Sequence, residues 1–470
     1  MNHQMKTLKT LTITSLIALS LQSCFVAKDY ERPNEAVLSD TSYRSIAPIA
    51  DSSSIASLSW KELFTDPLLV GHIETGLANN IDLQIALQQM DAAQAYYQQG
   101  KAGYLPSLSL QAQVTHQELS KNSQFGALFD GNVTQYDFTG TLGWEADIWG
   151  KIRSSKRAAQ AGFLQTTAAR QAVQTRLVSS IASLYFQLLT LDTQKELLER
   201  TVANRTHSLE TTKALKEAGI VTEVAVQQTQ AQLLNAQGML VDLDRDISLL
   251  ENSFSILLGS EPKSIARASF EDQVLVPHLK TGYPAQLLSN RPDVAAAEYR
   301  LVEAFELTNV ARSNLYPSVG LSVTGGFQSL ELDQLLNANS LFATLVGNIV
   351  QPLFNRRQLK TQFEVAETQQ EIAYLQFKQS LLTAAREVTD ALYDYQAASE
   401  KEVLKVQELQ ALTRATRYAE DLLENGMANY LEVLTARESA LNAEVQVTTT
   451  RLQQLLAVVE LYRALGGGSE

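Results

Sequence analysis

The residue types that most often carry enzyme chemistry are few in this chain and do not cluster along it. The five histidines are scattered, and the sequence contains no H-E-x-x-H, G-x-S-x-G or P-loop motif. Asp242, Asp244 and Asp246 alternate as in the first half of a calcium-binding loop, but Ile247 and Ser253 replace the glycine and glutamate that such a loop needs. We therefore interpret these aspartates as a charged helix face. We predict no catalytic residue, no metal site and no cofactor.

The single cysteine, Cys24, is placed where it could accept a lipid. Two lysines precede an apolar stretch, Leu11 to Leu21, which is too short to span a bilayer and is typical of an export signal. The stretch ends in Leu21-Gln22-Ser23-Cys24, which resembles the lipobox of bacterial lipoproteins. We therefore expect residues 1–23 to be a signal peptide and Cys24 to be the lipidated first residue of the mature chain. A plain signal peptide followed by an incidental cysteine is the alternative.

Composition excludes further classes of protein. Hydrophobic residues make up 45% of the 470 positions, which is within the globular range and excludes disorder of the whole chain. The net charge is −13, or −15 once the two lysines of residues 1–23 are removed, so nothing supplies a basic face for nucleic acid.

Phe25 follows the cysteine in place of the aspartate typical of inner-membrane retention, which favours an anchor in outer-membrane lipid. Residues 24–59 are predicted to be an extended tether.

The rest of the chain is an internal duplication. Four motifs recur in the same order in both halves, at offsets of 211 or 207 residues: 79–83 with 290–294, 104–108 with 315–319, Gly219 with Gly426, and Leu258-Gly259 with Leu465-Gly466. A unit of about 200 residues is far longer than a solenoid repeat. We therefore predict a first repeat over 60–259, a linker over 260–283 and a second repeat over 284–470.

Each half shows two strand patterns followed by very long helices. Apolar and polar residues alternate over 107–115, 137–149 and 318–328, whereas the stretch 341–354 is ambiguous. On pattern alone, a soluble sheet with one wet face is the commoner explanation, although the strands are long enough to cross a membrane with a tilt. No proline interrupts 151–218 or 356–425, which as helices would be about 100 Å long. Apolar residues recur in steps of four and three over 177–202, 226–257 and 441–462, which predicts coiled-coil seams.

Four strands are too few to close a barrel, for which about eight is the practical minimum. In hydrocarbon, each unpaired backbone group at a strand edge costs several kcal/mol. If the strands enter a membrane, the chain must therefore oligomerise. Two copies would give 8 strands filled by side chains, whereas three would give 12 strands around a water-filled lumen.

A set of short motifs, weak individually, stands in a fixed order along nearly the whole mature chain. They are Trp60 to Phe64 with Asp66-Pro67-Leu68, Asn80 to Leu83, Arg291 to Val294 with Ala297-Glu298, Tyr316-Pro317-Ser318, and Gly426 with Tyr430 to Leu434. In this order, behind a lipobox, the sequence resembles the outer-membrane factor family, the TolC/OprM-type lipoproteins of bacterial tripartite efflux systems.

The resemblance implies a mainly α fold with transmembrane β. Three chains would each give four strands to a 12-stranded outer-membrane barrel and coiled-coil helices to a periplasmic α-barrel. The homotrimer would meet a periplasmic adaptor protein and an inner-membrane pump, and would pass small toxic compounds such as drugs, dyes or metal ions without doing chemistry. Export of proteins by a type I secretion system is one alternative. A non-conducting, lipid-anchored periplasmic coiled-coil scaffold is another.

The resemblance also implies two functional regions in the helices. The adaptor would dock at the hairpin tips, at Gly219 with Val221 and at Gly426 with Met427, although these turns could be purely structural. Acidic rings constrict the periplasmic end in the family. Here Thr435 stands where the family often has aspartate, so Glu432 is the candidate gate charge. The alternative is that Glu432 is a surface acid, unpaired or paired with Arg437.

Overall fold

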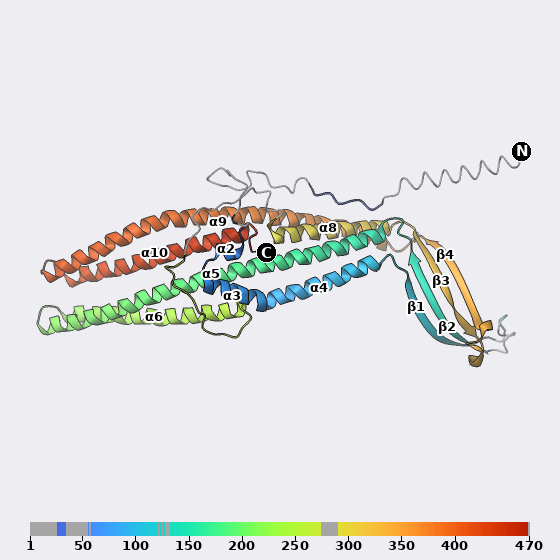
Figure 1. Ribbon diagram of the computed structural model, residues 1–470, viewed down its shortest axis with the longest axis horizontal. Coiled ribbons are helices and arrows are strands. Elements are labelled where there is room, and N and C mark those ends of the chain that lie inside the picture. Colours follow the sequence, from blue (N-terminus) through green and yellow to red (C-terminus); the bar gives the residue numbers. More distant parts are fainter. Residues whose placement is uncertain are drawn as a thin grey trace. The chain divides into compact units, whose positions relative to one another are not determined.

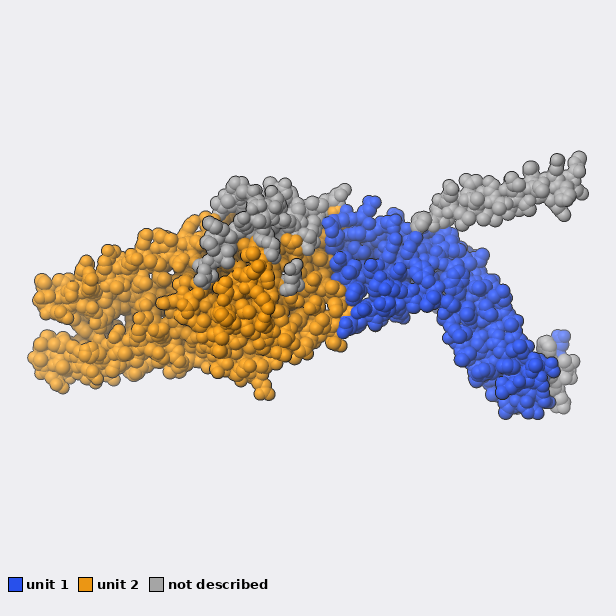
Figure 2. Space-filling model, in the orientation of Figure 1, with its two compact units in different colours: residues 1–32, 91–165, 297–376 blue, residues 33–90, 166–296, 377–470 orange. Residues whose placement is uncertain are grey.

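The computed structural model describes residues 26–33, 55, 58–120, 122–124, 126, 132–273 and 290–468. Cys24, the expected signal peptide and part of the expected linker lie outside these residues. The chain forms two compact units (Figure 2). Unit 1 comprises residues 1–32, 91–165 and 297–376, and unit 2 comprises residues 33–90, 166–296 and 377–470. Each unit therefore combines segments from both halves of the sequence.

Long helices dominate the chain, and four strands form its single described sheet (Figure 1). In chain order, the elements are α2 (Trp60–Leu63), α3 (Pro67–Asn79), α4 (Ile81–Ala102), β1 (Ser107–Glu118), β2 (Asn132–Glu145), α5 (Lys151–Glu217), α6 (Glu223–Leu257), α8 (Pro292–Ser313), β3 (Ser318–Ser329), the short 3-10 helices η4 (Leu332–Gln334) and η5 (Ala338–Ser340), β4 (Leu341–Val350), α9 (Gln358–Glu424) and α10 (Tyr430–Ala464).

The predicted duplication is confirmed by the matching lengths of the long helices and of the first strand in each half. Helices α4 and α8 have 22 residues each, α5 and α9 have 67 each, and α6 and α10 have 35 each. Strands β1 and β3 have 12 residues each. Among the described residues, no helix has an apolar stretch long enough to cross a bilayer.

The four strands pair antiparallel in the order β1-β2-β3-β4. One row of the register runs from Leu108 to Leu142, Val323 and Leu345. Directly opposed residues share a face of the sheet, so the register determines which side chains lie together. The ambiguous stretch 341–354 contains a true strand, β4, which ends at Val350.

The strand predicted over 137–149 is displaced in the structure to 132–145. The predicted strand positions Ala146 and Ile148 lie beyond its end. Asp147 explains the early end, because its two carboxylate oxygens accept the backbone N–H groups of Ile152 and Arg153 at 2.8 and 2.9 Å. The carboxylate thereby satisfies donors that the first turn of α5 would leave unpaired, and the backbone must leave the sheet to place it there.

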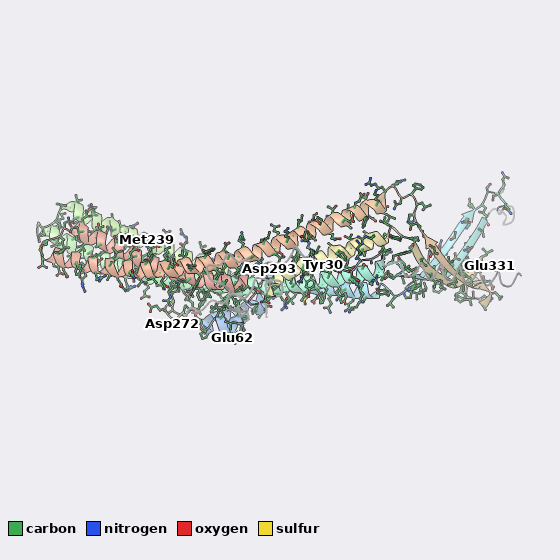
Figure 3. All side chains as sticks on the ribbon, turned by 90° about the horizontal axis from the view of Figure 1, so that it is seen from above. Tyr30, Glu62, Met239, Asp272, Asp293 and Glu331 are labelled. Carbon is green, nitrogen blue, oxygen red and sulfur yellow. The ribbon has the colours of Figure 1, made fainter. Side chains whose placement is uncertain are left out.

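Residues 26–33 have no regular secondary structure but are bound to unit 1. The backbone N–H of Lys28 donates to Oδ1 of Asn309, and Nδ2 of Asn309 donates to the Lys28 carbonyl, at 3.2 and 2.9 Å. Arg32 pairs with Glu298 at 2.6 Å. Tyr30, labelled in Figure 3, packs edge-on against Phe305, and its burial raises its pKa to about 12, with a further increase from Glu298. The segment immediately after the expected lipidation site is therefore fastened by side chains.

In unit 2, each repeat has a side chain just before α4 or α8 that bonds to the end of the last helix of that repeat. The Asn80 side chain donates to the Leu257 carbonyl, and the Arg291 side chain donates to the Ala464 carbonyl, each at 3.0 Å. These bonds satisfy carbonyls that the ends of α6 and α10 would otherwise leave unpaired. Arg291 is buried and is also held by Glu387 at 2.8 Å and by Asp293, which Figure 3 labels on α8. Burial would raise the pKa of Asp293, but its hydrogen bonds with Arg291 outweigh burial and lower it.

Two glycines with similar backbone angles should differ in their tolerance of alanine. Gly219 and Gly259 have φ values of 74° and 66°, so alanine at either should cost about 1 kcal/mol of conformational energy. A Cβ at Gly219 would meet nothing within 4 Å, whereas one at Gly259 would lie 2.2 Å from the Asn79 carbonyl oxygen. We expect Gly259→Ala to lower the free energy of unfolding by about 3 kcal/mol or more, measured by urea titration of the helical circular dichroism. Equal losses in the two variants would contradict this.

Candidate functional site: a channel wall and two helix tips

One face of the sheet in unit 1 is apolar and exposed. It carries Leu108, Leu110, Ala112 and Val114 of β1, Phe138, Leu142 and Trp144 of β2, Val319, Leu321, Val323 and Phe327 of β3, and Leu341, Leu345 and Ile349 of β4. Leu110 and Ile349, at the two edge strands, are 72% and 74% exposed. Water-exposed apolar patches of this extent mark an interaction with lipid or protein.

The opposite face, which we call the polar wall, is built mainly from hydroxyl and amide side chains that bond to one another. Gln111 donates to Gln113 at 2.8 Å, and Gln113 donates to Thr115 at 3.0 Å. The hydroxyls of Thr141 and Thr324 lie 3.2 Å apart across β2 and β3. Strand β4 departs from this pattern, since its Phe342, Val346 and Val350 also face this side. The wall is therefore polar and largely uncharged on three of its four strands.

The two edges of the sheet, β1 and β4, have no further strand beside them among the described residues. Each edge strand has backbone N–H and C=O groups that point away from the sheet. Such an edge is a template for pairing with another strand. The sheet thus offers a free pairing edge on each side.

In unit 2, the predicted glycine turns are confirmed in geometry. At the first tip (residues 215–224), Gly219 has a φ of 74°, and the Ile220 N–H donates to the Leu215 carbonyl at 2.9 Å. At the second tip (residues 422–431), Gly426 has a φ of 70°, and the Met427 N–H donates to the Leu422 carbonyl at 2.8 Å. Both tips are Schellman turns, in which a left-handed glycine ends the helix.

Exposed apolar side chains lie at equivalent positions on both tips. Ile220 and Met427 are equivalent at an offset of 207 residues and are 69% and 71% exposed. Val224 and Leu431 form a second exposed pair at the same offset. Val221, the residue singled out from the sequence, is half-buried. The sequence signal for Ile220 was available, because it aligns with Met427 in the duplication.

The carboxylate of Glu432 is exposed and is not neutralised by a cation among the described residues. It lies in the first turn of α10, where its backbone N–H donates to Oδ1 of Asn429 at 3.0 Å. The Asn429 amide donates in return to Oε1 of Glu432 at 3.2 Å. The suggested pairing with Arg437 is wrong, because Arg437 pairs with Glu420 at 2.7 Å and donates to Ser208.

Arginines tie the first hairpin, α5 and α6, to the second hairpin, α9 and α10. Arg205 of α5 pairs with Glu438 of α10 and donates to the Gln232 carbonyl of α6 at 2.7 Å. Arg437 of α10 donates to Ser208 of α5 at 2.8 Å. These ties border a groove of about 620 Å³ between α5, α9 and α10. Sequence reasoning missed them because they join residues more than 200 positions apart.

Asp242, Asp244 and Asp246 lie on helix α6 as interpreted, and pair with Arg245 or with Lys195. No group of three or more potential metal ligands occurs within the described residues.

At the first tip, Lys216 of α5 pairs with Glu223 of α6. The hydrogen bond from Lys216, followed by one from Gln227, holds the pKa of Glu223 below its usual value.

The chain matches the family model "Outer membrane efflux protein" over residues 73–260 and 283–467. It is 29% identical over 460 residues to the solvent efflux pump outer membrane protein SrpC of Pseudomonas putida, with 96% of each chain covered. It is 26% identical over 455 residues to the cation efflux system protein CusC of Escherichia coli O6:H1, covering 96% of this chain and 97% of the relative.

Solved structures show the same fold. The outer-membrane channel OprN superposes with a TM-score of 0.87 at 25% identity, covering 95% of this chain and all of OprN. The outer membrane protein VceC of Vibrio cholerae superposes with a TM-score of 0.79 at 27% identity, covering 87% and 98% of the two chains. The chain therefore belongs to the outer membrane efflux protein family. It is an efflux channel protein of the outer membrane, as its resemblance to the outer-membrane factors implied.

The tie between Arg205 and Glu438 can be tested by exchanging its charges. Arg205→Glu places two carboxylates together and should free α10 from α5, which raises the rate of proteolysis within α10. Adding Glu438→Arg should recover at least half of the protection, because a pair of this exposure couples by about 1 kcal/mol. Arg245→Gln is the matched control, since the acids that Arg245 pairs with in the described part of the chain lie on its own helix. If the double variant were cleaved as fast as Arg205→Glu, the tie would not hold the hairpins together.

Proposed function

We propose that the protein is the outer-membrane exit duct of a tripartite efflux pump. Three copies would close a 12-stranded barrel, and the duct would carry small toxic compounds received from a periplasmic adaptor and an inner-membrane pump. The printed names of relatives support this class of substrate, since SrpC belongs to a solvent efflux pump and CusC to a cation efflux system. Cys24 would add a lipid anchor in the same membrane.

The observation that carries the proposal is the two-faced sheet with open edges. An apolar face exposed at Leu110 and Ile349 suits lipid, and a hydroxyl- and amide-rich face suits a water-filled lumen. The open edges of β1 and β4 cannot remain unpaired in hydrocarbon. Three copies give a barrel wide enough for an aqueous channel. A soluble scaffold would have no use for an exposed apolar face on a sheet with two open edges.

For the periplasmic gate, we propose the first turn of α10. Glu432, Arg437 and Glu438 have uncharged equivalents in the first repeat, at Ala225, Gln230 and Ala231. The second hairpin therefore carries the charges that can both constrict a pore and tie it shut. Threefold repetition of Glu432 would give a negative ring that attracts cations.

For the adaptor, we propose docking at both tips through the exposed pairs Ile220 with Val224 and Met427 with Leu431. Apolar residues exposed at equivalent points of two repeats would recur six times in a trimer. They would offer a repeated set of contacts to adaptor hairpins, with Gly219 and Gly426 fixing the turns.

The duct is tested by conductance of the purified protein in planar bilayers. We expect a trimer by light scattering and discrete cation-selective channels, with Glu432→Gln reducing cation selectivity because it removes the proposed ring. Glu424→Gln is a control that removes one acid from the other side of the same tip. A monomer without conductance would overturn the duct, whereas unchanged selectivity in Glu432→Gln would remove only the gate assignment.

Deletion of the gene should increase sensitivity to drugs, dyes, detergents or metal ions. Loss of protein secretion without such sensitivity would favour type I secretion.

The tips are tested by placing charge on their exposed apolar residues. We expect Ile220→Glu and Met427→Glu together to reduce efflux and adaptor crosslinking at least about tenfold, which equals the loss of about 1.4 kcal/mol of binding. Val221→Ala, a mild change at a half-buried neighbour, should leave crosslinking nearly unchanged. The bilayer conductance of the doubly charged variant should persist. If crosslinking and efflux were intact in that variant, the adaptor would bind elsewhere.

A further inference from the structure

Basic residues gather where the strands of unit 1 join the helices. The four junctions lie between α4 and β1, β2 and α5, α8 and β3, and β4 and α9 (Figure 1). We call the residues that form them, 101–106, 145–160, 309–317 and 351–364, the junction belt. The belt contains three acids and nine basic residues: Lys101, Lys151, Arg153, Lys156, Arg157, Arg312, Arg356, Arg357 and Lys360. It is therefore positively charged, although the whole chain has a net charge of −13.

The acids of the belt neutralise only part of this charge. Glu145 pairs with Lys151 at 2.9 Å, and Glu364 pairs with Arg357 at 3.0 Å. The third acid, Asp147, accepts the backbone N–H groups at the start of α5. Three acids cannot neutralise nine basic residues, so the belt keeps a surplus of positive charge.

Some of these cations are exposed and have no acid beside them. In the part of the chain that the structure describes, Lys101 and Arg356 are both exposed and form no ion pair within 4.0 Å. Arg157, by contrast, pairs with Asp29 at 2.8 Å and with Glu306 at 3.5 Å. Exposed cations of the first kind are available to an anion from outside the chain.

The start of α9 shows that the helix itself does not favour these charges. Its first turn contains no acid and includes Lys360. A cation beside the positive end of a helix dipole costs about 0.3–1 kcal/mol. Just before the helix, Arg356 and Arg357 have φ values of 54° and 67°, which residues other than glycine rarely adopt. The equivalent of Arg357 in the first repeat is Gly150. The arginines are present despite these costs, which indicates an anionic partner.

Each junction also has an exposed apolar or aromatic side chain two to four positions from a basic residue of the belt. These side chains are Leu105, Ile148, Tyr316 and Phe354, which lie near Lys101, Lys151, Arg312 and Arg356 in that order. Phe354 is 99% exposed. At the boundary of a membrane, apolar and aromatic side chains enter the lipid while lysine and arginine reach the headgroups. The belt has the composition of such a boundary.

The N-terminal segment locates the belt relative to the expected lipid anchor. Ala27 is buried beside the junction of β2 and α5, where a Cβ at Gly150 would lie 2.9 Å from the Ala27 Cβ. Asp29 pairs with Arg157 of the same junction. The expected lipidation site, Cys24, comes three residues before Ala27, and three residues span at most about 11 Å. Acyl chains on Cys24 would therefore enter the membrane beside the belt.

We propose that the junction belt binds anionic phospholipid headgroups in the periplasmic leaflet of the outer membrane. This inference rests on the proposed function, because only a sheet inside the membrane places the junctions at the level of the headgroups. Each basic residue near an anionic lipid surface contributes about 1 kcal/mol of attraction. A free phosphate ion would need neither four junctions nor exposed apolar side chains. Together with acyl chains on Cys24, the belt provides a second signal for anchoring.

Tryptophan fluorescence can report which lipid occupies the belt. Trp144 and Trp149 lie at the junction of β2 and α5, whereas Trp60, the third tryptophan, is buried in unit 2. The lipidated full-length protein is placed in phosphatidylcholine vesicles that contain either brominated phosphatidylglycerol or brominated phosphatidylcholine, which quench a tryptophan they contact. We expect stronger quenching by the brominated phosphatidylglycerol. The preference should fall between about 0.1 M and about 1 M salt, because the screening length falls from about 10 Å to about 3 Å.

A variant that removes three exposed basic residues of the belt tests the assignment. Lys101→Gln, Arg356→Gln and Lys360→Gln together should reduce the preference for phosphatidylglycerol at least about fivefold, which equals about 1 kcal/mol. The matched control removes the same charge from exposed positions on the helices of unit 2, by Lys213→Gln, Arg386→Gln and Arg414→Gln. We expect the control variant to keep the native preference. Both variants should remain trimeric and conducting.

The outcomes separate the lipid site from the duct. Equal quenching by the two lipids in the native protein, or an equal loss of preference in the belt and control variants, would overturn the lipid site. An unchanged preference in the belt variant would do the same. If inorganic phosphate abolished the preference at constant ionic strength, the belt would bind phosphate ions and the lipid assignment would be wrong. Each of these results would leave the conductance intact. A protein that neither lipid quenches and that passes no current would overturn the duct itself.

Discussion

The arrangement depends on the backbone hydrogen bonds that β1 and β4 cannot make within one chain. The sheet has an apolar face that suits lipid and a polar wall that suits water. A sheet in that environment cannot have free edges, because no water in hydrocarbon replaces a missing strand. The number of strands per chain therefore makes oligomerisation a condition of membrane insertion. The lumen is a consequence of closing those edges.

The two repeats share the structural features that end and connect their helices. Both repeats end their long helices at left-handed glycines, and both fasten the end of the returning helix to the start of the shorter one. The repeats also differ in charge at equivalent positions. The neutral side chain of Asn80 makes this connection in the first repeat, whereas the charged side chain of Arg291 makes it in the second. The charges near the second tip, at Glu432 and Arg437, likewise have no counterpart in the first repeat.

The elements that the sequence predicted well are those governed by local chemistry. The absence of proline over 151–218 and 356–425 was enough to predict α5 and α9, and glycine was enough to predict the tips. The displaced end of β2 was not predictable in this way, because it depends on whether Asp147 caps the next helix or stays in the strand. The arginine ties could not be predicted from the sequence for a different reason. Their partners are distant in sequence, and several acids compete for each arginine until packing selects one.

The polar wall suits a duct that binds no solute tightly. Its amides and hydroxyls are largely satisfied by one another, as in the series Gln111, Gln113 and Thr115. A solute that binds such a surface must compete with bonds already made, so little free energy is gained at any one point. A channel must bind a permeating solute weakly enough to release it. A wall of saturated, mostly neutral groups meets that requirement for apolar and charged solutes alike, and discrimination must then arise before the solute enters the duct.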